Sequence, residues 1–275
     1  MEWWQSIVLG LVEGVTEFLP VSSTGHLLLA ERALGIPPTE AANAYAVCIQ
    51  FGAIAAVLGL YRARIAQMLR GLTGADAEGR RLLVHVLVAF VPAAVLGKLF
   101  NDPIERVLFG LWPVAAAWMV GGVLLVALPE LRKRRAHAAT FGLDGLTPQR
   151  AALIGLAQCA ALWPGTSRSL ATIVGAQLLG MELAAAVEFS FLLGLVTLSA
   201  AAGYKAFKSG GAMVTAIGPR DLVTGLVVAA LSAAVSVRWM VGWLQRRGLA
   251  IFGWYRVALA LVVAALLGTH VLRNQ

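Results

Sequence analysis

Two short polar segments interrupt an otherwise apolar chain, and both carry side chains that could do chemistry. The first begins with two carboxylates, Glu13 and Glu17, which a helix would place on one face because they are four residues apart. Carboxylates are costly in hydrocarbon, so a pair of them indicates a nearby cation, proton or water. The pair could instead cap or line a helix end, but the polar residues that follow weaken this alternative. They are Ser22, Ser23, Thr24 and His26.

The second segment combines a Pro-Gly turn, several hydroxyl groups and one guanidinium, that of Arg168. Backbone N–H groups at a helix N-terminus and the helix dipole favour negative charge, and arginine can bind phosphate through two hydrogen bonds. The segment therefore predicts an anion cradle, although Arg168 could instead neutralise Glu17 structurally. It lacks the GxxxxGK[ST] pattern of a P-loop. The other residues that we expect to bind the anion are Gly165, Thr166, Ser167, Ser169 and Thr172.

The composition indicates where these segments must work. Of the 275 residues, 59% are hydrophobic and 13% are charged, which excludes a disordered chain, a coiled coil and a disulfide scaffold. We expect an all-α integral membrane protein that forms a single membrane domain over residues 1–275. The net charge of +8 then reflects basic loops that set membrane topology, and no nucleic acid is expected as a partner. The N-terminus lacks the basic region of a cleavable signal peptide.

Apolar length separates spans from broken segments, because a helix needs about 20 apolar residues to cross a bilayer. Stretches 5–34 and 151–181 are each broken by a polar turn, which leaves half-length helices and predicts two re-entrant hairpins. Irregular backbone at membrane depth survives only where it lines protein or a wet cavity, so both turns point to a site. Six other stretches qualify as spans: 42–60, 82–100, 111–129, 184–204, 222–243 and 251–271.

The two broken stretches resemble each other. The segment Gly10–Glu13 matches Gly155–Gln158 145 residues later, whereas Ser23 matches Ser167 at a spacing of 144. The chain therefore reads as two copies, about 1–129 and about 150–275, each a hairpin followed by three spans. Because three is odd, the second copy must be inverted in the membrane, as in many transporters.

Basic residues predict the orientation. Loops 61–81, 130–150 and 244–250 fall on one side and hold 12 Lys and Arg residues, against six on the other side. The richer side is expected to be cytoplasmic, with Lys205 and Lys208 as exceptions on the opposite side. The first hairpin would then enter from outside and the second from the cytoplasm, so that their tips meet near the midplane.

Two segments, Glu13–His26 and Leu162–Ser169 with Thr172, resemble the two signatures of bacterial undecaprenyl-diphosphate phosphatases, also called bacitracin-resistance proteins. The resemblance extends from end to end, and it implies hydrolysis of undecaprenyl diphosphate to the monophosphate, which recycles the lipid carrier for peptidoglycan synthesis. It also implies the bacterial inner membrane, an active site open to the periplasm and a divalent cation, magnesium or calcium. Leu170 and Val196 stand where the family pattern has Gly and Pro.

The resemblance also suggests a role for each residue. Glu17 and Glu13 would hold the cation, and Arg168 with the loop N–H groups would bind the diphosphate. His26 would act as general acid and base, and Ser23 either as a nucleophile activated by His26 or as a ligand that positions water. The catalytic set is thus Glu17, Ser23, His26 and Arg168, with Ser22 and Thr24 as further substrate ligands.

Three questions stay open at this stage. The same architecture would suit a transporter or flippase of a polyprenyl phosphate, with the carboxylates as a cation-coupling site. A homodimer is an open alternative to a monomer. Arg238 and Arg256 are weaker site candidates, because long side chains in apolar helices can extend to the membrane interface.

Overall fold

The computed structural model describes residues 1–134 and 140–272, and within these ranges the chain forms helices and one isolated bridge, between Phe141 and Met181, but no strand. The elements are α1 (Trp3–Thr16), α2 (Ser23–Ala33), α3 (Glu40–Cys48), α4 (Gln50–Leu60), α5 (Arg62–Leu72), α6 (Ala77–Leu108), α7 (Leu111–Arg134), α8 (Pro148–Gln158), a short 3-10 turn (Cys159–Leu162), α9 (Arg168–Leu178), α10 (Leu183–Ile217), α11 (Pro219–Arg247) and α12 (Ala250–Gly268).

Among the described residues, six helical segments are long and apolar enough to cross a membrane, and each overlaps one predicted span. The all-α membrane fold is thereby confirmed, and the protein is a multi-pass membrane protein. One boundary differs markedly, because α10 continues to Ile217 instead of ending near residue 204. Lys205 and Lys208 therefore lie within a helix and not in a loop. The six segments are Glu40–Leu60, Ala77–Phe100, Leu111–Lys133, Leu183–Ile217, Pro219–Leu244 and Ala250–Gly268.

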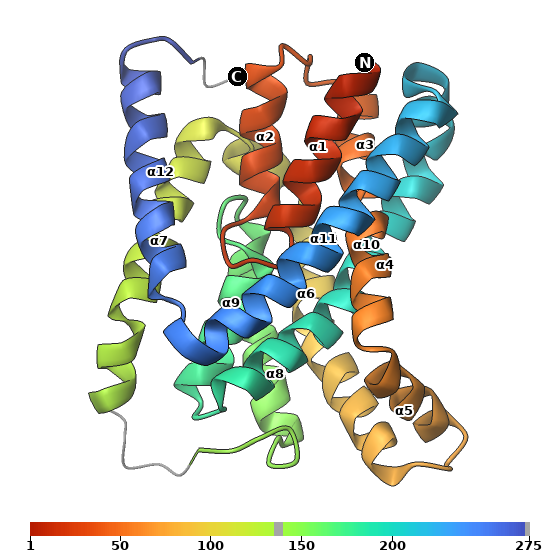
Figure 1. Cartoon of the computed structure of the whole chain (residues 1–275), viewed down its shortest axis with the longest axis vertical. Coiled ribbons are helices and arrows are strands. Elements are labelled where there is room, and N and C mark those ends of the chain that lie inside the picture. Colours follow the sequence, from red (N-terminus) through yellow and green to blue (C-terminus); the bar gives the residue numbers. More distant parts are fainter. Residues whose placement is uncertain (135–139, 273–275) are drawn as a thin grey trace.

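The two broken stretches form hairpins of half-length helices. The arms α1, α2, α8 and α9 have 14, 11, 11 and 11 residues, too few to span a bilayer. In Figure 1 the first hairpin enters from the end that holds the N-terminus and the second from the opposite end, so that their turns meet in the middle of the molecule. Helices α9 and α10 run unbroken through Leu170 and Val196, the two departures from the family pattern.

The two halves of the chain interlock. The first arm of each hairpin packs along a span of the other half, α1 along α11 and α8 along α6, and α7 likewise pairs with α12. Matched glycines explain the close approach: a Cβ at Gly10 would overlap the carbonyl oxygen of Gly225 and one at Gly155 that of Ala89. This reciprocal packing is consistent with two inverted repeats.

The turns share an unusual backbone that refines the alignment between the halves. Ser22 and Ser167 are the N-caps of α2 and α9, and both adopt left-handed φ angles, of 74° and 76°. They are 145 residues apart, the spacing that also relates Gly10 to Gly155. The predicted pairing of Ser23 with Ser167 is therefore one residue out of register, and Ser23 corresponds to Arg168.

The described parts of the basic segments lie toward one end of the molecule, and which side of the membrane that end faces stays a prediction. In Figure 1 helix α5 and the C-terminal end of α7 lie at the end opposite the N-terminus, and the α11–α12 connection lies in the same half. The predicted loop residue Arg135 and the terminal Arg273 lie outside the described residues.

Candidate active site

An ion pair joins the two turns. One terminal nitrogen of Arg168, the first residue of α9, lies 3.3 Å from Oε1 of Glu17, just beyond the end of α1. The Glu17 side chain is only 5% exposed and that of Arg168 only 9%, so water screens the pair weakly. The sequence left two roles open for Arg168, a counterion of Glu17 or part of an anion cradle. The contact fits both, because it neutralises Glu17 and brings the guanidinium to the carboxylates.

The second oxygen of Glu17 accepts a hydrogen bond from the hydroxyl of Ser23, the first residue of α2. Glu17 thus contacts the Arg168 guanidinium through one oxygen and the Ser23 hydroxyl through the other. A carboxylate in this position can take the hydroxyl proton when the serine oxygen attacks an electrophile. The structure gives Ser23 this partner, whereas the sequence analysis considered activation by His26.

Helix α10 holds the guanidinium from the other side. A second terminal nitrogen of Arg168 donates to the backbone carbonyl of Ser190 at 2.8 Å. Gly194 lies one helical turn further, and a Cβ there would overlap the guanidinium. Neither residue was predicted, although Ser190 follows Glu188-Phe189, the segment that matches Gln50-Phe51 of the first half.

Glu13 provides the least satisfied charge at the site. Its side chain is fully buried, and among the described residues neither of its carboxylate oxygens has a hydrogen-bond donor. A buried, unpaired carboxylate is very unfavourable unless a cation or proton joins it. No cluster of three or more His, Cys, Asp or Glu side chains in the described chain could hold a metal ion. Two carboxylates completed by phosphate oxygens and water nevertheless fit a hard divalent cation such as Mg²⁺.

The two ring nitrogens of His26 contact groups other than the Ser23 hydroxyl. Its Nδ1 lies 2.7 Å from the carbonyl oxygen of Ser22 and its Nε2 lies 2.7 Å from the hydroxyl of Tyr255. The ring of Trp118 packs against it edge-on at 5.1 Å between centroids. Within the described residues, the ring hydrogen bonds of His26 therefore go to the backbone of the first turn and to α12, and not to Glu17 or the Ser23 hydroxyl.

Most of the predicted anion-binding hydroxyls are used inside the protein. Ser169 donates to the carbonyl of Leu19 at 3.0 Å, and Thr172 pairs with the hydroxyl of Ser190 at 2.7 Å. Ser22 and Ser167 cap their helices as acceptors, so the Ser22 hydroxyl could still donate to a ligand, whereas the other three hydroxyls would have to exchange bonds to do so. Thr24 and Thr166 are half-buried at the starts of α2 and α9, and Gly165 forms the turn with a φ of 95°.

Arg256 of α12 holds the two turns together, a role that the sequence analysis did not predict. Its fully buried guanidinium donates to the carbonyl of Pro20 in the first turn at 3.3 Å and to that of Gly165 in the second at 2.8 Å. A third bond, of 2.9 Å, reaches the carbonyl of Ala117. The available signal was an arginine in the middle of an apolar span, where burial demands acceptors.

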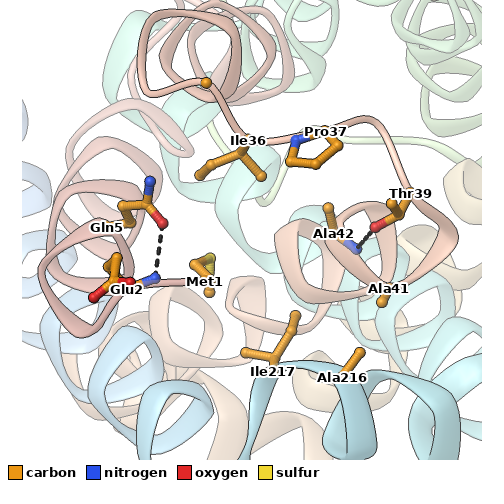
Figure 2. A pocket seen from close by; sticks show the side chains of 11 residues that line it. Met1, Glu2, Gln5, Ile36, Pro37, Thr39, Ala41, Ala42, Ala216 and Ile217 are labelled. Carbon is orange, nitrogen blue, oxygen red and sulfur yellow. Dashed lines mark hydrogen bonds between the residues drawn. The ribbon is translucent and has the colours of Figure 1, made fainter.

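A separate hollow of about 300 Å³ lies away from this site, and none of the predicted site residues lines it. Figure 2 shows it between the N-terminal turn of α1, the loop that precedes α3 and the end of α10. Mainly small and apolar side chains such as Ile36, Ala42 and Ile217 surround it. The hollow therefore holds none of the groups that the sequence analysis singled out.

Comparisons with known proteins agree over most of the chain. A family model described as bacitracin resistance protein BacA matches residues 6–262. The chain is 47% identical over 264 residues to an undecaprenyl-diphosphatase of Sorangium cellulosum, which covers 96% of this chain and 86% of the relative. It is 42% identical to undecaprenyl-diphosphatase 2 of Rhodospirillum rubrum, with 95% and 93% covered, and 43% identical to an undecaprenyl-diphosphatase of Burkholderia mallei, with 96% of each covered.

Proposed function

Because the chain belongs to the bacitracin resistance protein BacA family, we propose that it hydrolyses undecaprenyl diphosphate to undecaprenyl phosphate and inorganic phosphate. This activity would recycle the lipid carrier for peptidoglycan and other envelope polymers and thereby give resistance to bacitracin. The observation that carries the proposal is the placement of Glu17 between Arg168 and Ser23. The Arg168 guanidinium can bind a phosphate oxygen, and the Glu17 carboxylate can accept the proton of the Ser23 hydroxyl.

The contacts support a specific division of labour. Arg168 binds oxygens of the terminal phosphoryl group and stabilises the charge that develops on them. In the covalent route, Ser23 Oγ forms a bond to the terminal phosphorus, Glu17 takes the serine proton, and undecaprenyl phosphate leaves as the P–O bond breaks. Water then hydrolyses the phosphoserine. In the direct route, Ser23 positions a water that attacks the same phosphorus, and trapping a phosphorylated Ser23 would distinguish the two routes.

We further propose that Glu13 and Glu17 hold a divalent cation, magnesium or calcium. Such a cation would neutralise charge on the phosphoryl oxygens when substrate is bound. The two orphaned oxygens of Glu13 support this assignment. Chelation should therefore stop turnover, and re-addition of the cation should restore it.

The direct test is phosphate release from undecaprenyl diphosphate by purified protein in detergent, with and without a chelator. Release that requires the cation supports the proposal. A protein that moves the labelled lipid phosphate across a vesicle bilayer but releases no phosphate would instead be the transporter considered from the sequence.

We place the protein in the bacterial inner membrane, with the site open to the periplasm. Single cysteines in a background without Cys48 and Cys159 test this orientation with an impermeant thiol reagent in intact cells. A cysteine at Pro38 should be labelled, whereas one at Ala75, in the loop after α5, should be protected. The reverse pattern would invert the orientation, and crosslinking between copies would test the homodimer.

A further inference from the structure

Tyr255 of α12 contacts a predicted catalytic residue that is 229 positions earlier in the chain. Its hydroxyl lies 2.7 Å from Nε2 of His26, and the two rings are stacked, with centroids 5.7 Å apart and planes within 7° of parallel. The residue is 46% exposed, so the pair lies at an open edge of the site.

The two bonds of the His26 ring fix where its proton lies. A backbone carbonyl can only accept, so the contact with the Ser22 carbonyl at 2.7 Å places a proton on Nδ1. In the neutral ring, Nε2 then carries a lone pair and accepts the hydrogen bond that the Tyr255 hydroxyl donates. The tyrosine thus completes the orientation of the imidazole and favours one of its two neutral tautomers.

The position of Tyr255 is set by its neighbour in the sequence. Arg256, the next residue, is anchored to the carbonyls of Pro20 and Gly165, one from each turn. Helix α12 is therefore fixed in register against both hairpins, and the tyrosine hydroxyl is held at a defined place relative to α2, which carries His26.

We infer that Tyr255 is a positioning residue that acts through His26 in the hydrolytic reaction, and this inference rests on the proposed function. It holds His26 with Nε2 ready to receive a proton from the water that attacks phosphorus. When Nε2 gains that proton, it becomes a donor, the tyrosine oxygen accepts from it, and the tyrosine turns its own O–H toward water. His26 then releases the proton to water, which restores the neutral Nδ1–H ring, and Tyr255 undergoes no covalent change.

A double-mutant cycle tests this coupling. Tyr255→Phe keeps the stacked ring and removes the hydroxyl, and we expect kcat to fall about 3- to 10-fold with KM unchanged within about twofold, the effect of one hydrogen bond. In a His26→Gln background the same change should have no further effect on kcat. Tyr204→Phe, at an exposed tyrosine of α10, is the matched control and should behave as the parent protein.

A second measurement does not depend on turnover. Nitrogen-15 spectra of the histidine side chains in detergent should show His26 as the Nδ1–H tautomer, identified by its loss in His26→Gln, and Tyr255→Phe should produce a tautomer mixture. Multiplicative losses in the cycle, an increase in KM alone or an unchanged tautomer would overturn the inference. Absence of phosphate release by the parent protein would instead count against the proposed function. The histidine spectra would then test the coupling of Tyr255 to His26 on their own.

Discussion

The two turns at the centre of the molecule share a backbone but not a chemistry. In both, a half-length helix enters, a serine with a left-handed φ angle caps the next helix, and a buried carbonyl binds Arg256. At positions 145 residues apart, however, Ser23 of the first turn corresponds to Arg168 of the second, and Glu17 corresponds to Leu162. The first turn carries the negative and proton-accepting groups, and the second carries the positive one.

The two turns therefore share their backbone conformation, which we call the frame, and differ in the charges of their side chains. Two identical acidic turns would repel each other at the midplane, and two identical basic turns would do the same. The Glu17–Arg168 pair forms because the two turns carry opposite charges at their meeting point. Substitutions can therefore test whether the shared frame or the divergent charges govern activity.

The largest loss should come from Glu17→Gln, which keeps the shape of the side chain but removes the acceptor for the Ser23 proton and the charge opposite Arg168. We expect phosphate release to fall about 100- to 10,000-fold, the usual contribution of a positioned acid or base. Glu40→Gln is the matched control, because Glu40 also accepts from a serine, Ser209 at 2.7 Å, but lies away from the turns. Comparable losses in both variants would remove Glu17 from the mechanism.

Arg168→Lys should rank second. A lysine cannot contact Glu17, the Ser190 carbonyl and a phosphate oxygen at once through a planar fork. Loss of one charge-assisted bond in a largely buried site costs about 1.5–3 kcal/mol, or about 10- to 150-fold in kcat/KM. Near-parental kcat/KM would show that only the net charge of the second turn matters.

Gly194→Ala should have an intermediate effect, although it replaces no charged residue. The new methyl group would push the Arg168 guanidinium away from its partners, and we expect a loss of about 5- to 30-fold in kcat/KM, corresponding to about 1–2 kcal/mol. Gly203→Ala on the same helix is the control, because a Cβ there meets open space. Equal activity of the two variants would mean that the guanidinium can move without cost.

The smallest effect should come from Ser22→Gly and Ser167→Gly, which alter the shared frame alone. Glycine adopts the left-handed φ without strain, and replacing an N-cap serine by glycine costs only about a few tenths of a kcal/mol. We expect the thermal midpoint to stay within about 2 °C of the parent and activity to stay within about threefold. A tenfold drop in kcat/KM with normal stability would instead identify the serine hydroxyls as substrate ligands.

Much of the fold was predictable because the signals are local. Apolar length marked all six spans, and the Pro- and Gly-containing interruptions marked both hairpins. The alignment between the copies was one residue out of register because Ser23 and Ser167 match by residue type, whereas the backbone pairs Ser22 with Ser167. Shared φ angles cannot be read from residue types alone.

The residues whose roles were not predicted, including Arg256, which was only a weaker candidate, share a different cause. Gly194, Tyr255 and Arg256 lie in apolar spans and contact the turns only through the tertiary structure. Hydrophobic periodicity reports that a helix is buried but not which side chains it presents to a partner far away in sequence. Activation of Ser23 by His26 was one of two roles considered for the serine, yet the bonds of the His26 ring go to the Ser22 carbonyl and to Tyr255 of α12.

The interlocked halves have a consequence for how the protein is made. Helix α1 is among the first segments to leave the ribosome, but its packing partner α11 follows roughly two hundred residues later, about 10 to 40 seconds at ordinary synthesis rates. During that interval the first hairpin carries Glu13 and Glu17 into the membrane without Arg168 or α11. Until the second half of the chain is synthesised, the two carboxylates therefore need other polar partners, which water, lipid headgroups or the insertion machinery can supply.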